Sequence, residues 1–263
     1  MRSMLVDWLI DVGEERHLRT STLHLGVSVV DRFLAGANAS VATGELQLVG
    51  CAAMWMAAKY EEVFGNAPPL ADFVYLSGNL YEHDEMRRME ASILAALGHK
   101  LATPTVLCFL DNFMADVDPD ESTRQLAAFF ADVSLTAYSL LVWLPSTLAA
   151  AALKLALRSR GLSWARGGLC DAPAASKPWY IERGGRMTAP QDPRVWAGLQ
   201  AHTERELCDL HECACLLYAA AKHAVQQARL GELEARHFPI FAHTARALAD
   251  CAQAVHKPQT RAS

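Results

Sequence analysis

Residues 46–62 read Leu46-Gln-Leu-Val-Gly-Cys-Ala-Ala-Met-Trp-Met-Ala-Ala-Lys-Tyr-Glu-Glu62. Up to residue 58 the run is apolar almost all the way round a helix, a pattern typical of a helix buried on every side. It then ends in one cation and two carboxylates. Because Lys and Glu side chains are rarely buried unless they are paired, Lys59 needs a partner. Glu90, on a later predicted helix, is one candidate, and a second protein is another.

Helical patterns flank this central run on both sides. Apolar residues at every third or fourth position predict an amphipathic helix over residues 23–34, with Ser21 or Thr22 as its cap. Another predicted helix, over residues 84–97, carries its apolar side chains on one face and ends at Gly98.

The second half of the chain is also predicted to be mainly helical. Helical patterns run over residues 107–157 and resume from residue 196 to beyond residue 217. Residues 161–193 are rich in Gly, Pro, Ser and Arg without periodicity, so we interpret them as a long surface insertion. No run alternates with period two for long enough to indicate a sheet. The sequence therefore predicts an all-α protein of two lobes, with a boundary near residues 102–106.

Composition excludes several classes of protein. Apolar residues make up 52% of the 263 residues, enough for a sizeable core, and the net charge of −5 argues against nucleic acid as a partner. The seven cysteines form no Cys-x-x-Cys pair, and their odd number indicates reduced thiols in an intracellular compartment. Arg2, Asp7 and Asp11 interrupt the first apolar run, so we predict no signal peptide.

One stretch, residues 139–157, approaches the ~20 apolar residues that a membrane-spanning helix needs. Pro145, Ser146, Thr147 and Lys154 lie inside it. We therefore interpret it as a turn followed by a buried, Ala-rich helix, and expect no contact with a membrane.

Motifs of catalysis are missing from the sequence. It has no Gly-rich phosphate loop, no HExxH, no GxSxG and no kinase signature, so we expect neither a catalytic residue nor a cofactor. Cys208, His211 and Cys215 share one helical face and could bind a metal with His202 or Cys213 as a fourth ligand. We favour packing of small thiols in a core and predict no metal site.

Several sequence words occur in order and at close to family spacing over roughly the first 110 residues. They are Met1-Arg-Ser-Met-Leu-Val-Asp-Trp-Leu-Ile-Asp-Val-Gly-Glu-Glu15, Thr22-Leu-His-Leu25, Val30-Asp-Arg-Phe-Leu34, Leu46-Gln-Leu-Val-Gly50, Ala57-Ala-Lys-Tyr-Glu-Glu62, Asp72-Phe-Val-Tyr75, Met89-Glu90 and Pro104-Thr-Val106. Looser matches follow at Trp143-Leu-Pro-Ser146 and Asp209-Leu-His211. Together they resemble the cyclin boxes of A- and B-type cyclins.

The resemblance implies two cyclin-box repeats of about five helices each, over residues 1–103 and 104–263, with the insertion at 161–193 in the second. It implies a regulatory subunit that catalyses nothing itself and that binds and activates a cyclin-dependent serine/threonine kinase in the nucleus and cytoplasm. The match starts inside the first box. The helix that precedes the box in the family and the destruction box have no counterpart in this sequence. We expect either that the sequence is a fragment or truncated gene model, or that this cyclin lacks these two controls.

The resemblance also implies a kinase-binding surface. In the family, the positions of Lys59 and Glu90 together face the mobile αC helix of the kinase, above an apolar floor and beside an acidic rim. The matching residues here are Lys59, Glu90, Tyr60, Glu61, Glu62, Leu94, His99 and Leu101. His99 stands where the family usually has an aromatic residue.

A second surface is implied at the start of the chain. Apolar side chains recur there at helical spacing, and in cyclins this stripe is an exposed groove that docks Arg-x-Leu peptides of substrates and inhibitors. The groove residues are Met1, Met4, Leu5, Trp8, Asp11 and Gln47. Asp11 replaces the glutamate of the family and is one methylene shorter. Arg2 and Asp31 are implied to form a structural ion pair between two helices.

A competing hypothesis is a cyclin-fold adaptor or scaffold that does not activate a kinase. Such a protein would keep the groove at the start of the chain but lose the surface around Lys59 and Glu90. Because the sequence carries both, we prefer the kinase activator.

Overall fold

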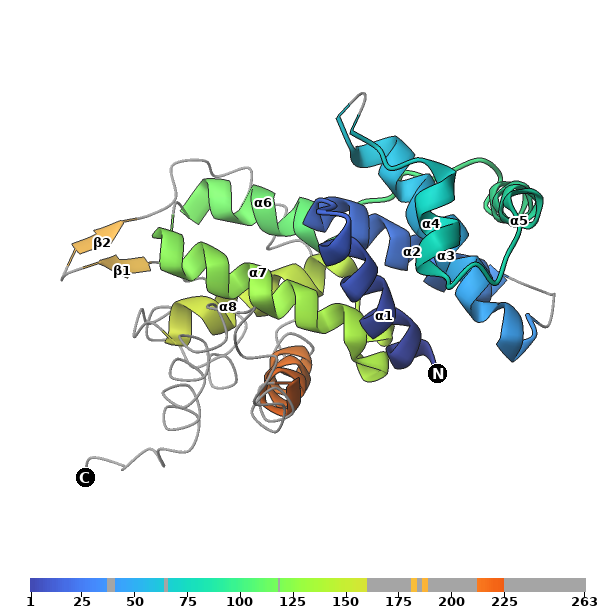
Figure 1. Cartoon of the computed structure of the whole chain (residues 1–263). Coiled ribbons are helices and arrows are strands. Elements are labelled where there is room, and N and C mark those ends of the chain that lie inside the picture. Colours follow the sequence, from blue (N-terminus) through green and yellow to red (C-terminus); the bar gives the residue numbers. More distant parts are fainter. Residues whose placement is uncertain are drawn as a thin grey trace, which may run out of the picture. The chain divides into compact units, whose positions relative to one another are not determined.

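The computed structural model describes residues 1–36, 41–63, 66–117, 119–159, 181–183, 186–188 and 212–224 (Figure 1). The chain divides into two compact units, Met1–Leu107 and Cys108–Ser263, and each is described here by itself. Among the described residues, the regular secondary structure is helical except for one pair of short strands, which confirms the predicted all-α class.

The first unit is built around one central helix. Its elements are α1 (Arg2–Glu15), α2 (Thr20–Gly36), the short 3-10 helix η1 (Thr43–Glu45), α3 (Leu46–Glu61), α4 (Leu70–Leu76) and α5 (His83–Ala96). Helix α3 contacts all four of the other α-helices in this unit. Within residues 48–58, all of which the structure describes, every residue except Trp55 is buried, as the apolar run predicted.

Two glycines allow helices to approach α3 closely. A Cβ atom at Gly26 on α2 would lie 2.4 Å from the sulfur of Met54, and one at Gly50 on α3 would lie 2.9 Å from Cδ1 of Leu5. Because atoms cannot pack at such distances, a larger residue at either position would force the side chain of Met54 or Leu5 to move. The scaffold that supports the end of α3 is therefore tightly packed.

Helix α2 begins differently from the prediction. It starts at Thr20, so Ser21 and Thr22 lie inside its first turn, and the prediction of either as the cap was wrong. Glu62 supplies the carboxylate instead, because its Oε1 accepts hydrogen bonds from the backbone N–H of Arg19 (2.9 Å) and from Oγ1 of Thr22 (2.6 Å). A residue 40 positions away thus takes the role expected of a local side chain.

The second unit contains α6 (Val106–Val117, whose first two residues belong to the first unit), α7 (Glu121–Thr136), the 3-10 helix η2 (Tyr138–Val142), α8 (Pro145–Ser159) and a helical segment at 212–224. Helix α8 packs on α7 and is mostly buried, in agreement with the predicted turn and Ala-rich core helix. Among the residues described, no helix combines the length and the hydrophobicity that crossing a membrane requires.

A small antiparallel sheet lies inside the predicted insertion. Strand β1 (Ile181–Arg183) pairs with β2 (Arg186–Thr188), with Glu182 opposite Met187. Strands of three residues are too short to produce a readable alternation, which is why the sequence indicated no sheet. The rest of the insertion at 161–193, and the predicted helical region before residue 212, lie outside the described residues.

Candidate functional site

An ion pair joins the end of α3 to the middle of α5. The ammonium of Lys59 donates a hydrogen bond to Oε1 of Glu90, and the two side chains are 39% and 19% exposed. Lys59 lies in the last turn of α3, where the helix dipole also favours a cation. Glu90 is therefore a partner of Lys59 within the chain, and the pair still reaches the surface.

The indole of Trp55 lies on another side of the same ammonium. Nζ of Lys59 is 3.5 Å from the centre of the indole ring, well within the ~6 Å over which a cation–π interaction is attractive. Trp55 precedes Lys59 by four residues, so both project from the same face of α3. Sequence reasoning treated Trp55 as part of the core, although the spacing of four could have indicated the contact.

The other residues implied to bind a kinase differ in exposure. Tyr60 is 55% exposed and His99 is exposed, whereas Glu61, Leu94 and Leu101 are half-buried. The side chain of Glu62 is only 7% exposed, and its carboxylate is bound to the start of α2. Glu62 therefore has a structural role in this unit.

The segment that follows α5 has an unusual backbone. Gly98 and His99 both adopt left-handed conformations, with φ of 58° and 60°. Their N–H groups bond to the carbonyls of Ala95 (3.1 Å) and Leu94 (2.9 Å), which closes the end of α5. A left-handed conformation is uncommon for a residue other than glycine, so surrounding contacts must hold His99 in place.

Arg32 on α2 provides such contacts. Its guanidinium donates to the carbonyl oxygens of Lys100 and Leu101, the latter at 2.9 Å, and to Oγ1 of Thr103 at 3.4 Å. The hydroxyl of Ser28 lies 3.2 Å from the same Thr103 oxygen. Arg32 thus holds the segment that carries His99 and Leu101. Sequence reasoning missed it because its acceptors are backbone groups about 70 positions away.

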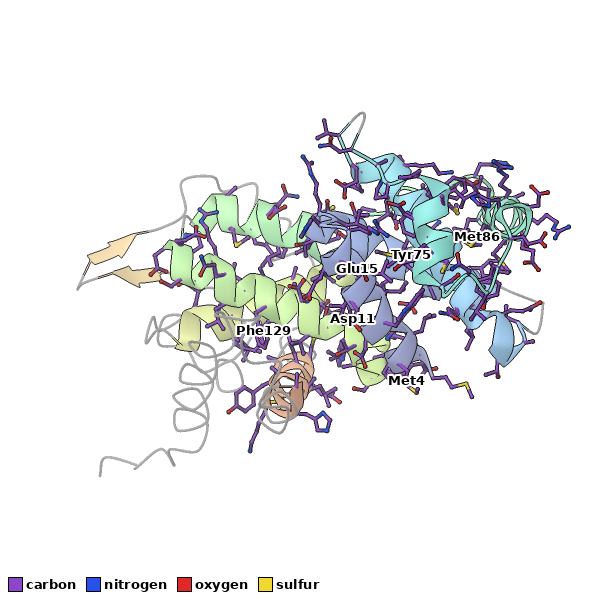
Figure 2. All side chains as sticks on the ribbon, viewed as in Figure 1. Met4, Asp11, Glu15, Tyr75, Met86 and Phe129 are labelled. Atoms are coloured by element: carbon purple, nitrogen blue, oxygen red, sulfur yellow. The ribbon has the colours of Figure 1, made fainter. Side chains whose placement is uncertain are left out.

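The surface implied on α1 is partly apolar and partly acidic. Met1 and Met4 are 70% and 73% exposed, Trp8 is half-buried and Asp11 is exposed. Figure 2 shows Met4 and Asp11 on this helix. Leu5 differs, because it is 8% exposed.

Gln47 contributes a half-buried side chain from the first turn of α3, and Leu5 packs near Gly50 one turn further along. An acidic pair lies on α1 itself. Partial desolvation raises the pKa of Asp7, and the carboxylate of Asp11 one turn later raises it further.

Arg2 and Asp31 join α1 to α2 through two hydrogen bonds. Nε of Arg2 lies 2.6 Å from Oδ1 of Asp31, and the second bond, from a terminal nitrogen to Oδ2, measures 2.7 Å. The side chains are 11% and 23% exposed. This fork geometry is the strong form of the arginine–carboxylate pair.

The described residues contain no group of three or more His, Cys, Asp or Glu side chains that could hold a metal ion. Burial raises the pKa of the Cys213 thiol to about 12, so this side chain stays protonated. Cys208, His211 and His202 lie outside the described residues.

Comparison with known families supplies two matches in chain order. Residues 1–102 match the model of the cyclin N-terminal domain, and residues 104–167 match that of the cyclin C-terminal domain.

Curated relatives include a G2/mitotic-specific cyclin-A of Patella vulgata, 43% identical over 157 residues, which are 59% of this chain and 36% of the relative. Another is the cyclin-A2 of Homo sapiens, 44% identical over 167 residues, covering 62% of this chain and 38% of the relative. The chain thus spans less than two fifths of the length of these relatives.

Solved structures share the fold at low identity. A viral cyclin from herpesvirus saimiri has a TM-score of 0.61 at 17% identity, over 85% of each chain. A chain of the CAK complex from Chaetomium thermophilum bound to ATP-gamma-S has a TM-score of 0.53 at 14% identity, covering all of this chain and 81% of that one. These two structures show the shared fold alone. The two family models, together with the A-type relatives, show that the chain belongs to the cyclin family, as an A/B-type cyclin with two cyclin boxes.

Proposed function

We propose that this cyclin is a regulatory subunit that binds and activates a cyclin-dependent serine/threonine kinase and supplies no catalytic group of its own. The observation that carries the proposal is the Lys59–Glu90 pair, which reaches the surface of the first unit beside the exposed Tyr60. Solved structures with this fold include a chain of the yeast RNA Pol II CTD kinase CTDK-1 complex and a chain of the CAK complex bound to ATP-gamma-S, which supports a kinase as the partner.

The physical mechanism is a shift of the kinase between two states. A kinase transfers phosphate only when its β3 lysine pairs with the glutamate of its αC helix. A rigid partner that binds only the inward position of αC favours that state, and about 5.5 kcal/mol of differential affinity moves an equilibrium from 1:99 to 99:1. The Lys59–Glu90 pair suits this role, because side chains that are already ordered lose little entropy on binding.

The region after α5 fits the same surface. His99 and Leu101 lie on a segment that Arg32 holds, and half-buried Leu94 comes from the last turns of α5. An apolar floor with a fixed polar group beside it is the usual anatomy of a specific protein interface. We include Lys59, Tyr60, Glu61, Glu90, Leu94, His99 and Leu101 in the proposed surface and leave out Glu62, whose carboxylate is bound to α2.

We further propose that the exposed face of α1 docks Arg-x-Leu segments of substrates or inhibitors. Met1, Met4 and Trp8 would contact the leucine, and the exposed carboxylate of Asp11 would pair with the arginine. The half-buried Gln47 would lie at its edge, while the buried Leu5 supports the face from below.

Residues 1–103 and 104–263 would form the two boxes, and the protein would act in the nucleus and cytoplasm.

The proposal is tested by mixing the purified chain with a panel of cyclin-dependent kinases and measuring binding and phosphorylation of a histone-type substrate. We expect a complex and a rate well above that of the kinase alone. Binding without activation would identify a cyclin-fold adaptor instead, and no binding to any kinase would overturn the proposal.

Docking on α1 is tested separately with a fluorescent Arg-x-Leu peptide. Trp8→Ala should weaken its binding, and Asp11→Glu should strengthen it, because the longer side chain reaches further toward the peptide arginine. Tyr75→Ala, which removes an exposed aromatic side chain on α4, is the control and should have no effect. Equal binding by the wild type and Trp8→Ala would remove the docking proposal.

A further inference from the structure

We propose that Trp55 is a positioning residue of the kinase-binding surface: with Glu90 it holds the ammonium of Lys59 from two sides, so that the partner meets a lysine already in place. This inference rests on the proposed function. It adds a residue that neither the sequence motifs nor the family resemblance had assigned to the surface.

Trp55 is partly exposed, unlike its neighbours on α3. Residues 48–58 form the most buried stretch of the first unit, and Trp55 is the one member of that stretch that is not buried. Burial of the helix does not by itself require a large aromatic side chain at position 55. The large ring instead comes to the surface, and the ammonium of Lys59 lies over its face at 3.5 Å.

The ammonium of Lys59 has two different partners within the chain. It carries three N–H donors, and one of them is bonded to Oε1 of Glu90. The face of the indole ring also attracts the positive charge of the ammonium. A lysine side chain has four rotatable bonds, and an isolated ion pair at a surface restricts them weakly. A flat ring on one side and a carboxylate from α5 on another leave far fewer rotamers. The ammonium is then directed at one place on the surface.

Trp55 is thereby predicted to set how tightly the surface binds. Of the aromatic side chains, tryptophan attracts a cation best, so Trp55→Phe should keep part of the effect and Trp55→Leu should lose it. Loss of a cation–π contact at an exposed site corresponds to an affinity about two- to fivefold weaker. Packing alone predicts similar losses for the two variants, because leucine and phenylalanine both fill apolar space.

The test combines a spectroscopic and a binding measurement on the full chain. The ring current of an indole shifts protons above its face upfield, so the ε-CH2 protons of Lys59 should resonate upfield in the wild type and return toward ordinary lysine values in Trp55→Leu. Kinase binding should fall about two- to fivefold in Trp55→Leu and less in Trp55→Phe. Tyr75→Leu, an exposed aromatic on α4, is the matched control and should change neither quantity.

A double-mutant cycle separates positioning from packing. If Trp55 acts through Lys59, Trp55→Leu should have no further effect on kinase affinity in a chain that already carries Lys59→Met. An unshifted Lys59 resonance in the wild type would overturn the inference. The inference would also be overturned if Trp55→Leu left the affinity for the kinase unchanged. It would be overturned as well if Trp55→Leu reduced that affinity equally in the wild type and in the Lys59→Met chain. A wild type that binds no kinase would overturn the proposed function itself, which is a distinct result.

Discussion

Two ion pairs of the first unit join different pairs of helices and differ in the exposure of their cations. Arg2–Asp31 links α1 to α2 through two parallel hydrogen bonds, with side chains 11% and 23% exposed. Lys59–Glu90 links α3 to α5 through a single hydrogen bond, and its side chains are 39% and 19% exposed. The first geometry consumes the fork of the arginine, whereas the second leaves an ammonium with further donors at the surface.

The same kind of interaction therefore serves two purposes in this unit. A shielded bidentate pair fixes helices, because removal of either partner strands a charge away from water. A pair at the surface contributes little to stability, since solvent screens it, and its ordered charges remain accessible to a second protein. We therefore expect the first pair to affect folding and the second to affect binding.

The largest expected effect follows from removal of the shielded pair. Arg2→Met should lower the free energy of unfolding by about 3 kcal/mol, because Asp31 is left mostly shielded from water without this partner. Urea denaturation of the full chain measures the loss. Arg87→Met, which removes an exposed pair with Asp84, is the matched control and should cost less than about 1 kcal/mol. Equal losses in the two variants would erase the proposed difference between pairs.

The surface pair should show the opposite distribution of effects. Glu90→Gln should weaken kinase binding by about 1–2 kcal/mol, because Lys59 keeps its charge but loses the group that orders it. Its free energy of unfolding should change by less than about 1 kcal/mol. Binding by titration calorimetry and unfolding by urea separate the two. A variant that binds normally but unfolds easily would assign Glu90 to the structural class.

A smaller effect is expected where a structural contact supports the binding surface. Arg32→Lys should weaken kinase binding by about 1 kcal/mol, because an ammonium cannot bond the carbonyls of Lys100 and Leu101 in the fork geometry of a guanidinium. Faster amide hydrogen exchange in residues 98–103 should accompany the loss. Unchanged exchange with weaker binding would mean that Arg32 acts in another way.

The smallest expected effect concerns two like charges on α1. The pKa of Asp7 is raised in the folded chain by desolvation and by Asp11, so its ionised form is less favourable there than in the unfolded chain. The contribution of Asp7 to stability is therefore fully present below its pKa in the unfolded chain. It is lost as the pH rises through its pKa in the folded chain. Asp7→Asn should therefore raise the melting temperature slightly at pH 7 and leave it unchanged near pH 3. A gain at both values would point to a cause other than charge.

The sequence predicted the parts of this fold that depend on local pattern. The burial of α3 followed from residues apolar on every side, and Glu90 was already a candidate partner of Lys59. Contacts between distant positions were missed, since nothing near Glu62 in the sequence indicates a cap for α2, and nothing near Arg32 indicates carbonyl acceptors after α5. Trp55 was assigned to the core because its neighbours are apolar, and only the structure shows its ring beneath a cation.

We propose above that the surface around Lys59 activates a kinase. The most direct test of this proposal compares phosphorylation of a histone-type substrate by a cyclin-dependent kinase in the presence of the wild type and of Lys59→Ala, at equal concentrations of folded chain. Arg88→Ala, which removes an exposed cation from α5, serves as the charge-matched control. We predict that Lys59→Ala keeps the circular dichroism spectrum and melting temperature of the wild type but loses most of the activation, while Arg88→Ala retains it. Full activation by a folded Lys59→Ala chain would contradict the account.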